Sequence, residues 1–125
     1  MKYDDNNIFA KILRGEIPCN KIYEDEFVLS FYDINPQKKI HALVIPKGKY
    51  IDLDDFSVNA SNEEIIGLMK GVTNVAKKLG ISSIDGKGYR ALANISYYGG
   101  QEVPHLHFHL FGGEKVGNMV SWLLK

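Results

Sequence analysis

Residues 105–110 read His105-Leu106-His107-Phe108-His109-Leu110, so three of the four histidines of the chain alternate with apolar residues. Successive side chains of a β-strand point to opposite faces. The pattern therefore predicts a strand with its apolar side chains in a core and its three imidazoles on the other face. Imidazole titrates near neutral pH and can serve as acid, base or nucleophile, so the histidine face is the candidate reaction site.

A shared metal ion is one alternative explanation of the three histidines. Residues two apart on a strand are separated by about 6.6 Å, so two such imidazoles can converge on one ion. His105 and His109 are separated by about 13 Å along a strand, too far for bonds of about 2.1 Å to the same ion. A two-histidine site would need His41 and a carboxylate as further ligands. A second alternative is that the histidines are ordinary residues of a solvated sheet face.

A histidine nucleophile is the interpretation that we favour, and we expect no metal and no cofactor. Neutral imidazole attacks phosphorus well and leaves readily, so a displacement at phosphate can proceed through a covalent intermediate. The nucleophile must be held in one tautomer through its other ring nitrogen, with donors nearby for the phosphate oxygens. Candidate donors are His109, Gln101 and the backbone amides of Gly99, Gly100 and Gln101.

The remaining pattern predicts one α+β domain over residues 1–125, with a mainly antiparallel sheet, one long helix and one short helix. Asn6 or Asn7 caps the short helix, which ends at Gly15. The long helix covers 61–79 and begins with a capping box of Ser61 and Glu64. Gly67 and Gly71 inside it predict close packing against another element. Strands are expected at 21–24, 27–32, 40–46 and 89–94, in addition to the histidine strand.

Composition excludes several classes of protein. Lysine plus arginine equals aspartate plus glutamate at 15 each, so no overall positive field favours nucleic acid as a partner. Cys19 is the single cysteine, which excludes an internal disulfide and favours a reducing compartment. No secretory signal and no membrane span are visible, and we therefore expect a cytoplasmic protein without membrane partners. The apolar tail residues are expected to pack on this subunit or on a partner; they are Met119, Val120, Trp122, Leu123 and Leu124.

Residues 105–111 resemble the histidine triad motif, His-φ-His-φ-His-φ-φ with φ apolar. Five segments that precede this motif show further similarity to the same family, in the same order along the chain: 7–12, 15–18, 31–37, 41–47 and 99–103. Together these segments resemble the histidine triad (HIT) superfamily in its bacterial-type nucleotide-binding form, the purine nucleoside phosphoramidase branch. The tail 112–125 matches this family weakly.

The resemblance implies a sheet of about five strands, a homodimer, and hydrolysis of the phosphorus–nitrogen bond of purine nucleoside 5′-monophosphoramidates. His107 would be the nucleophile that becomes nucleotidylated, and a purine nucleotide of the AMP or GMP type would be released. His109 would contact the phosphate, while His105 and His41 would support the nucleophile. His41 taken alone would more often be a hydrogen-bonded core histidine.

The resemblance also implies a set of substrate-binding residues. Asp33 would accept hydrogen bonds from the ribose hydroxyls. The purine would lie in an apolar cleft of Phe9, Ile12, Ile17, Phe31 and Ile34. The phosphate and leaving group would meet Asn94, Gly100, Gln101 and Glu102. Each of these residues also has a structural alternative. Asp33 would be a turn residue, the apolar positions ordinary core, and Asn94 and Gln101 partners of the loop backbone.

Two residues depart from the family pattern. Glu102 stands where other members carry a hydroxyl residue, and Pro104 replaces an aromatic residue just before the triad. Alternative functions within the superfamily are hydrolysis of dinucleoside polyphosphates and nucleotidyl transfer. A third alternative is a nucleotide-binding regulatory or interaction module.

Overall fold

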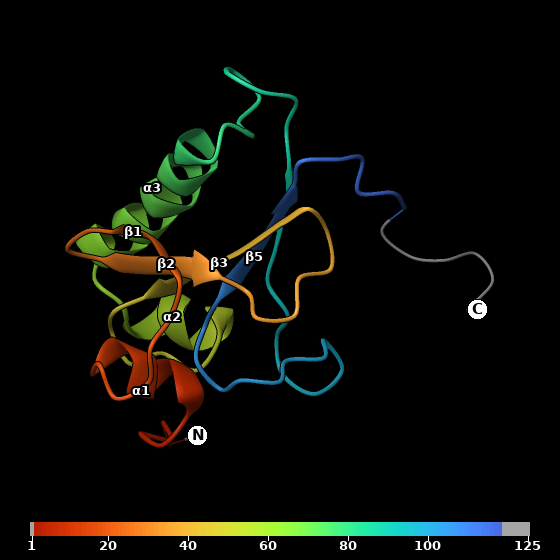
Figure 1. The fold of residues 1–125 in the computed structure, drawn as a ribbon. Coiled ribbons are helices and arrows are strands. Elements are labelled where there is room, and N and C mark those ends of the chain that lie inside the picture. Colours follow the sequence, from red (N-terminus) through yellow and green to blue (C-terminus); the bar gives the residue numbers. More distant parts are fainter. Residues whose placement is uncertain (1, 119–125) are drawn as a thin grey trace.

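The computed structural model describes residues 2–118, which form a five-stranded antiparallel sheet and three helices (Figure 1). The strand order is β1-β2-β3-β5-β4, so β1 and β4 are the sheet edges. The predicted α+β class is confirmed. The tail residues Met119, Val120, Trp122, Leu123 and Leu124 lie outside the described residues. In chain order the elements are α1 (Ile8–Leu13), β1 (Lys21–Glu24), β2 (Val28–Tyr32), β3 (Ile40–Pro46), α2 (Leu53–Asn59), α3 (Asn62–Lys78), β4 (Arg90–Leu92) and β5 (Phe108–Gly112).

The two predicted helices begin at the predicted caps. The Asn7 side chain accepts a hydrogen bond of 2.9 Å from the amide of Ala10, which satisfies one of the free donors at the start of α1. Ser61 and Glu64 form both hydrogen bonds of a capping box at the start of α3. Local side-chain chemistry therefore sets where both helices start.

Helix α2 was missed by the sequence interpretation, which expected one long and one short helix. Its seven residues form only about two turns and bury only Phe56, which is too little for a periodic apolar signal. Its cap is regular: the Asp52 carboxylate accepts a hydrogen bond of 2.8 Å from the amide of Asp55. The Asp52 cap is therefore the signal in the sequence from which α2 could have been predicted.

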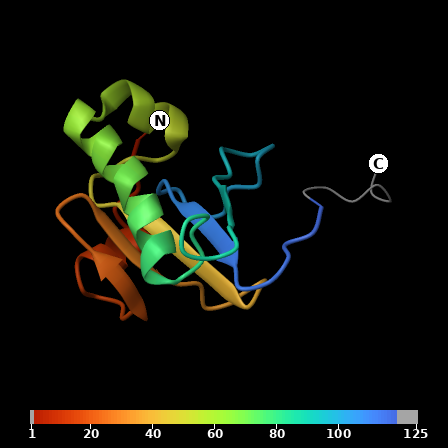
Figure 2. The same cartoon turned by 90° about the horizontal axis from the view of Figure 1, so that it is seen from above.

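Helix α3 crosses one face of the sheet (Figure 2). The core on this face joins Val28, Val44 and Leu110 of the sheet to Leu68 and other residues of the helix. The helix approaches closely because of its glycines. A methyl group at Gly71 would lie 2.7 Å from Val28 Cγ2, and one at Gly67 would overlap the ring of Phe27. The close packing predicted from these two glycines is confirmed.

A second core lies on the opposite face, beneath α1. It contains Phe9, Leu29, Phe31, Leu43 and Ile45. The two cores follow from strand alternation, because neighbouring residues of the central strand β3 serve opposite faces. Beyond this second core, the same face continues over β3 and β5 toward the histidines.

The histidine segment differs from the prediction at its start: β5 begins only at Phe108, so His105 and His107 precede the strand. The amide of Leu106 bonds instead to the Tyr50 carbonyl, and the amide of His105 closes a turn onto Val103. The apolar alternation nevertheless holds, since Leu106, Phe108 and Leu110 all pack in the α3-side core. The strand predicted at 89–94 is also shorter in the structure, where it is β4 (Arg90–Leu92). Among the described residues, no helix is long and apolar enough to cross a membrane.

Candidate functional site

A cavity of about 470 Å³ opens on the sheet face opposite α3. It collects side chains from α1, from the loop after β2, from β3, β4 and β5, and from the loop before the histidines. Its walls combine imidazoles, one aspartate and apolar side chains, a mixture typical of a ligand site. The lining residues are Phe9, Asp33, Asn35, Gln37, His41, Leu43, Leu92, Asn94, Gly100, Glu102, Val103, His107, His109 and Phe111.

Strand register brings His41 to this cavity. In the antiparallel pair of β3 and β5, His41 lies opposite Phe111 and Leu43 lies opposite His109. Because alternate residues share a face, these four side chains line the same wall. The His41 ring packs against Phe111 with 4.3 Å between centroids. A histidine 68 positions away in the sequence thus joins the triad.

His107 is held in a single tautomer. Its Nδ1 lies 2.7 Å from the backbone carbonyl of His105, and a carbonyl only accepts, so the ring proton is on Nδ1. Nε2 therefore keeps its lone pair. Burial lowers the pKa of His107, which keeps the ring neutral at pH 7. The edge of Phe9 contacts this ring, with 5.0 Å between centroids. The result is a neutral, oriented imidazole at the cavity wall.

His109 carries its proton on the other nitrogen. The amide of Gln37 donates to His41 Nδ1 over 3.1 Å, so the proton of a neutral His41 is on Nε2. His41 Nε2 lies 2.9 Å from His109 Nδ1 and donates to it, which leaves the His109 proton on Nε2. Burial, followed by the nearby His107 and His41, lowers the pKa of His109 to about 4. His109 is thus a neutral donor beside His107, with 5.1 Å between the ring centroids.

Asp33, His41 and His109 form the one cluster of three or more metal-ligand side chains within residues 2–118, with ligand atoms within 4.8 Å of one another. The cluster holds His41 and a carboxylate, the further ligands that a two-histidine metal site would need, but only one histidine of the triad. Their hydrogen bonds fit a metal poorly, because His41 Nε2 bears the ring proton and donates it to His109. Asp33 Oδ2 lies 3.4 Å from the same nitrogen. The arrangement suits a proton-sharing cluster better than a metal centre.

His105 lies outside the cavity and is fully buried. Its Nε2 lies 2.8 Å from the Pro46 carbonyl, and its Nδ1 lies 2.6 Å from the hydroxyl of Tyr3. Burial lowers the pKa of His105 to about 4. The three histidines were expected to share one reaction face. The structure instead places two of them at the cavity and the third behind it.

The predicted purine residues are dispersed. Phe9 lines the cavity, and Phe31 lies behind it, packed edge-on against Phe9 at 5.5 Å. Ile12 and Ile17 line a different hollow of about 510 Å³, next to Cys19. Ile34 is 87% exposed and does not line the cavity. The purine-binding roles of these residues remain predictions.

The other predicted binding residues divide in the same way. Asp33, Asn94, Gly100 and Glu102 line the cavity. The Gln101 side chain is used by the loop itself: its amide nitrogen donates to the carbonyls of Ile51 and Val103, and its oxygen accepts from the Ser96 amide.

The loop amides expected to bind phosphate are partly occupied. The amide of Gly100 donates to Tyr97, and that of Gln101 donates to Ser96. These two bonds close the turn that leads into the histidine segment, so neither amide is free for a ligand. Two of the candidate phosphate donors are thus bonded within the loop itself.

Six cavity residues were not predicted. Leu43 and Phe111 were accessible to the sequence interpretation, since they stand two positions from His41 and His109 on predicted strands. The others depend on loop geometry or on β4 register, which no local pattern specifies. The six residues are Asn35, Gln37, Leu43, Leu92, Val103 and Phe111.

The chain is similar to known proteins over most of its length. The family model described as the HIT domain matches residues 14–116. An uncharacterised HIT-like protein of Azospirillum brasilense is 53% identical over 119 residues, covering 95% of each chain. The purine nucleoside phosphoramidase of Escherichia coli K12 is 40% identical over 117 residues, covering 94% of this chain and 95% of its own. A solved HIT family hydrolase from Clostridium thermocellum, 39% identical, superposes with a TM-score of 0.82 over 94% of this chain and 99% of its own.

Proposed function

The chain belongs to the HIT domain family, and from this premise we propose that it hydrolyses the phosphorus–nitrogen bond of purine nucleoside 5′-monophosphoramidates. The Escherichia coli relative that bears the name of this activity supports the choice of reaction. A purine nucleoside monophosphate is the proposed product.

The observation that carries the proposal is the protonation of His107. Its Nδ1–H is committed to the His105 carbonyl, so the lone pair of Nε2 is available at a cavity wall. A histidine nucleophile requires this tautomer. Beside it, the Nε2–H of His109 is a donor for an oxygen of the α-phosphate, whose negative charge grows as the nucleophile attacks.

The reaction proceeds in two displacements. In the first, the Nε2 lone pair of His107 forms a bond to the α-phosphorus, and the bond from phosphorus to the amine nitrogen breaks. The amine leaves with that electron pair and takes a proton from solvent. In the second, water attacks phosphorus and releases its proton to solvent, and the bond from phosphorus to Nε2 returns its pair to His107. Free amine and nucleoside monophosphate are the products.

Asp33 is proposed to hold the ribose, because its carboxylate lies at the cavity and accepts from hydroxyls. A homodimer joined through the sheet is proposed as the working assembly. The edge strand β4 offers unpaired backbone groups on one side, which a second copy can pair.

The test combines turnover with intact mass spectrometry. Wild type mixed with adenosine 5′-phosphoramidate is expected to release AMP, and a slow substrate is expected to leave one AMP-sized adduct that maps to His107. His107→Ala should lose both signals. The matched control is Ser57→Ala, an exposed hydroxyl of α2 on another part of the molecule. Full turnover by His107→Ala, or an adduct on another residue, would refute the proposal. Faster cleavage of diadenosine polyphosphate would move the function to that substrate class.

A further inference from the structure

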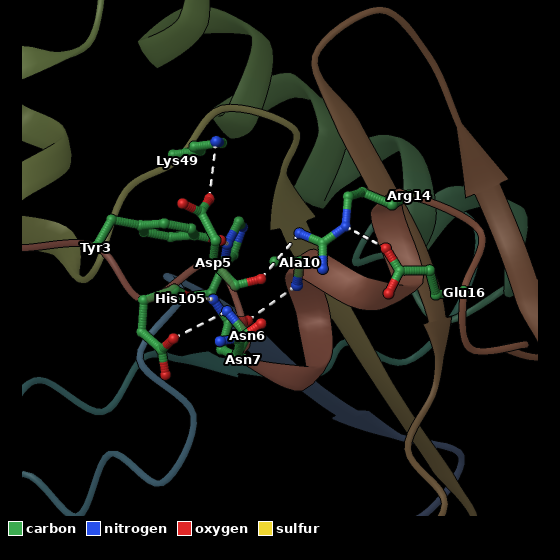
Figure 3. A network of polar contacts seen from close by, with 10 residues as sticks. Tyr3, Asp5, Asn6, Asn7, Ala10, Arg14, Glu16, Lys49 and His105 are labelled. Atoms are coloured by element: carbon green, nitrogen blue, oxygen red, sulfur yellow. Dashed lines mark hydrogen bonds and ion pairs between the residues drawn. The ribbon is translucent and has the colours of Figure 1, made fainter.

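The N-terminal segment reaches His105, where the Tyr3 ring lies close to the imidazole (Figure 3). The Tyr3 hydroxyl lies 2.6 Å from His105 Nδ1, and the two rings meet edge to face with 5.7 Å between centroids. Tyr3 lies outside residues 14–116, the part of the chain matched by the HIT domain. The contact thus joins a residue outside the matched range to the first histidine of the triad.

The direction of this hydrogen bond follows from the other side of the ring. His105 Nε2 faces the Pro46 carbonyl at 2.8 Å, and a carbonyl can only accept. The proton of the neutral ring is therefore on Nε2, which leaves a lone pair on Nδ1. Tyr3 donates its hydroxyl proton to that lone pair. Burial raises the pKa of Tyr3 above its usual value, so the hydroxyl remains a donor at neutral pH.

His105 connects Tyr3 to the nucleophile through its own backbone. The His105 carbonyl is the group that accepts the Nδ1–H of His107. Both ring nitrogens of His105 are bonded, so the ring cannot rotate freely, and the residue whose carbonyl holds His107 is anchored through its side chain. The Phe9 ring lies edge-on to both imidazoles, at 6.3 Å from His105 and 5.0 Å from His107. The orientation of His107 thus depends on a residue that does not line the cavity.

The segment that carries Tyr3 is fastened on both sides. Asp5 pairs with Lys49 over 2.8 Å, and the Asp5 carbonyl accepts from the Arg14 guanidinium over 2.8 Å (Figure 3). The Asn7 side chain caps α1 and also donates to the Asp4 carbonyl. These contacts come from the two ends of α1 and from Lys49, so Tyr3 is held against His105 by more than its own hydroxyl.

We propose that Tyr3 is a positioning residue for the reaction, whose hydroxyl holds His105 in the tautomer that orients His107. The inference rests on the proposed function. It implies that the hydroxyl affects the chemical step and leaves substrate binding unchanged, because Tyr3 lies outside the cavity.

The test is Tyr3→Phe, which keeps the ring and removes only the hydroxyl. The expected result is a fall in kcat of about three- to tenfold with KM unchanged, the worth of one neutral hydrogen bond. Nitrogen NMR of the His105 ring should show Nδ1 moving toward the shift of a free lone pair. The matched control is Tyr23→Phe, which removes a hydroxyl bonded to Asp25 far from the site and should leave kcat unchanged.

A second variant tests the segment rather than the hydroxyl. Asp5→Asn weakens the ion pair with Lys49 and should lower kcat in the same direction by a smaller factor. The inference is overturned if kcat of Tyr3→Phe stays within twofold of wild type, or if KM rises in proportion. If wild type shows no phosphoramidate turnover, the proposed function fails. The His105 nitrogen shifts then decide the hydrogen bond alone, and unchanged shifts in Tyr3→Phe overturn the inference independently.

Discussion

His105 and His109 occupy the two ends of one alternating sequence, yet their surroundings are opposite. His109 lines a cavity and receives its hydrogen bond from another histidine. His105 is fully buried, with its ring between the Pro46 carbonyl and the Tyr3 hydroxyl. Burial lowers the pKa of both to about 4. A shared pattern and a shared pKa direction therefore conceal two different positions: one ring lines the cavity and the other is buried behind it.

The difference arises where β5 begins. From Phe108 onward the chain follows the sheet, so His109 stands on the cavity face beside His41. Before Phe108 the backbone turns toward Tyr50 and Val103, which carries His105 beneath Phe9. Strand alternation alone would have made the three rings equivalent.

The largest effect that separates the two ends is expected from His109→Asn. Removing the Nε2–H donor should lower kcat for an adenosine phosphoramidate by about 100- to 1000-fold, the usual cost of losing one donor to a developing negative charge. The free energy of unfolding should change by less than about 1 kcal/mol, because the side chain lies at the cavity wall. Steady-state kinetics and urea unfolding measure the two quantities. If His109→Asn instead shows a large loss in the free energy of unfolding, His109 does not differ from His105 in its structural role.

The opposite balance is expected for His105→Leu. Leucine retains the bulk of the ring but leaves the Pro46 carbonyl and the Tyr3 hydroxyl without their partner. The free energy of unfolding should fall by roughly 2 to 3 kcal/mol, as for other buried polar groups that lose a partner. Turnover should fall less than in His109→Asn. Urea unfolding at pH 7.5 provides the measurement, and wild-type stability in this variant would contradict a supporting role for His105.

Acidification should also reveal the role of His105, through its effect on the free energy of unfolding. The folded-state pKa of His105 is about 4 against about 6.5 in the unfolded chain, so between these values the unfolded state binds more protons. Stability therefore falls as pH drops through this window, and His105 alone contributes a loss of about 2 kcal/mol by pH 5. Urea unfolding of wild type and His105→Leu at pH 7.5 and 5.0 checks it. The variant should lose less stability on acidification; an equal loss in both would assign the effect to other groups.

The smallest effect is expected at Asp33, on the cavity side. Asp33→Asn removes the charge that would accept from the ribose, and KM should rise about tenfold, equivalent to roughly 1.4 kcal/mol. A 2′-deoxyribose substrate is the control, because its KM should differ less between variant and wild type. Equal increases for both sugars would remove Asp33 from ribose recognition.

Much of the fold could be predicted from local chemistry. The caps at Asn7 and Ser61 and the glycines of α3 each act within one or two turns, so the sequence carries their signals directly. Helix α2 was missed because it buries only Phe56 and therefore lacks periodicity. The start of β5 was predicted too early. The amide of Leu106 bonds to the Tyr50 carbonyl, which is distant in the sequence, and the amide of His105 bonds to the Val103 carbonyl in a turn.

The site was less predictable than the fold. The participation of His41 depends on the register of β3 against β5, and local alternation specifies a face but not a partner. The use of the Gly100 and Gln101 amides within their own turn depends on loop closure. Tyr3 carried no signal at all, because a tyrosine near the N-terminus has no spacing relationship to a histidine 102 positions later.

The partners of the imidazoles have a consequence for how the site withstands mutation. Three of the ring nitrogens are bound by the main chain: by the carbonyls of Pro46 and His105 and by the amide of Gln37. A codon change replaces a side chain but leaves the peptide group in place, so the ring contacts made by Gln37 and Pro46 need neither an amide nor a pyrrolidine side chain. Replacing the side chains of Gln37 and Pro46 is therefore expected to leave the hydrogen bonds to His41 and His105 in place. Substitution of the histidines themselves is expected to affect the site more.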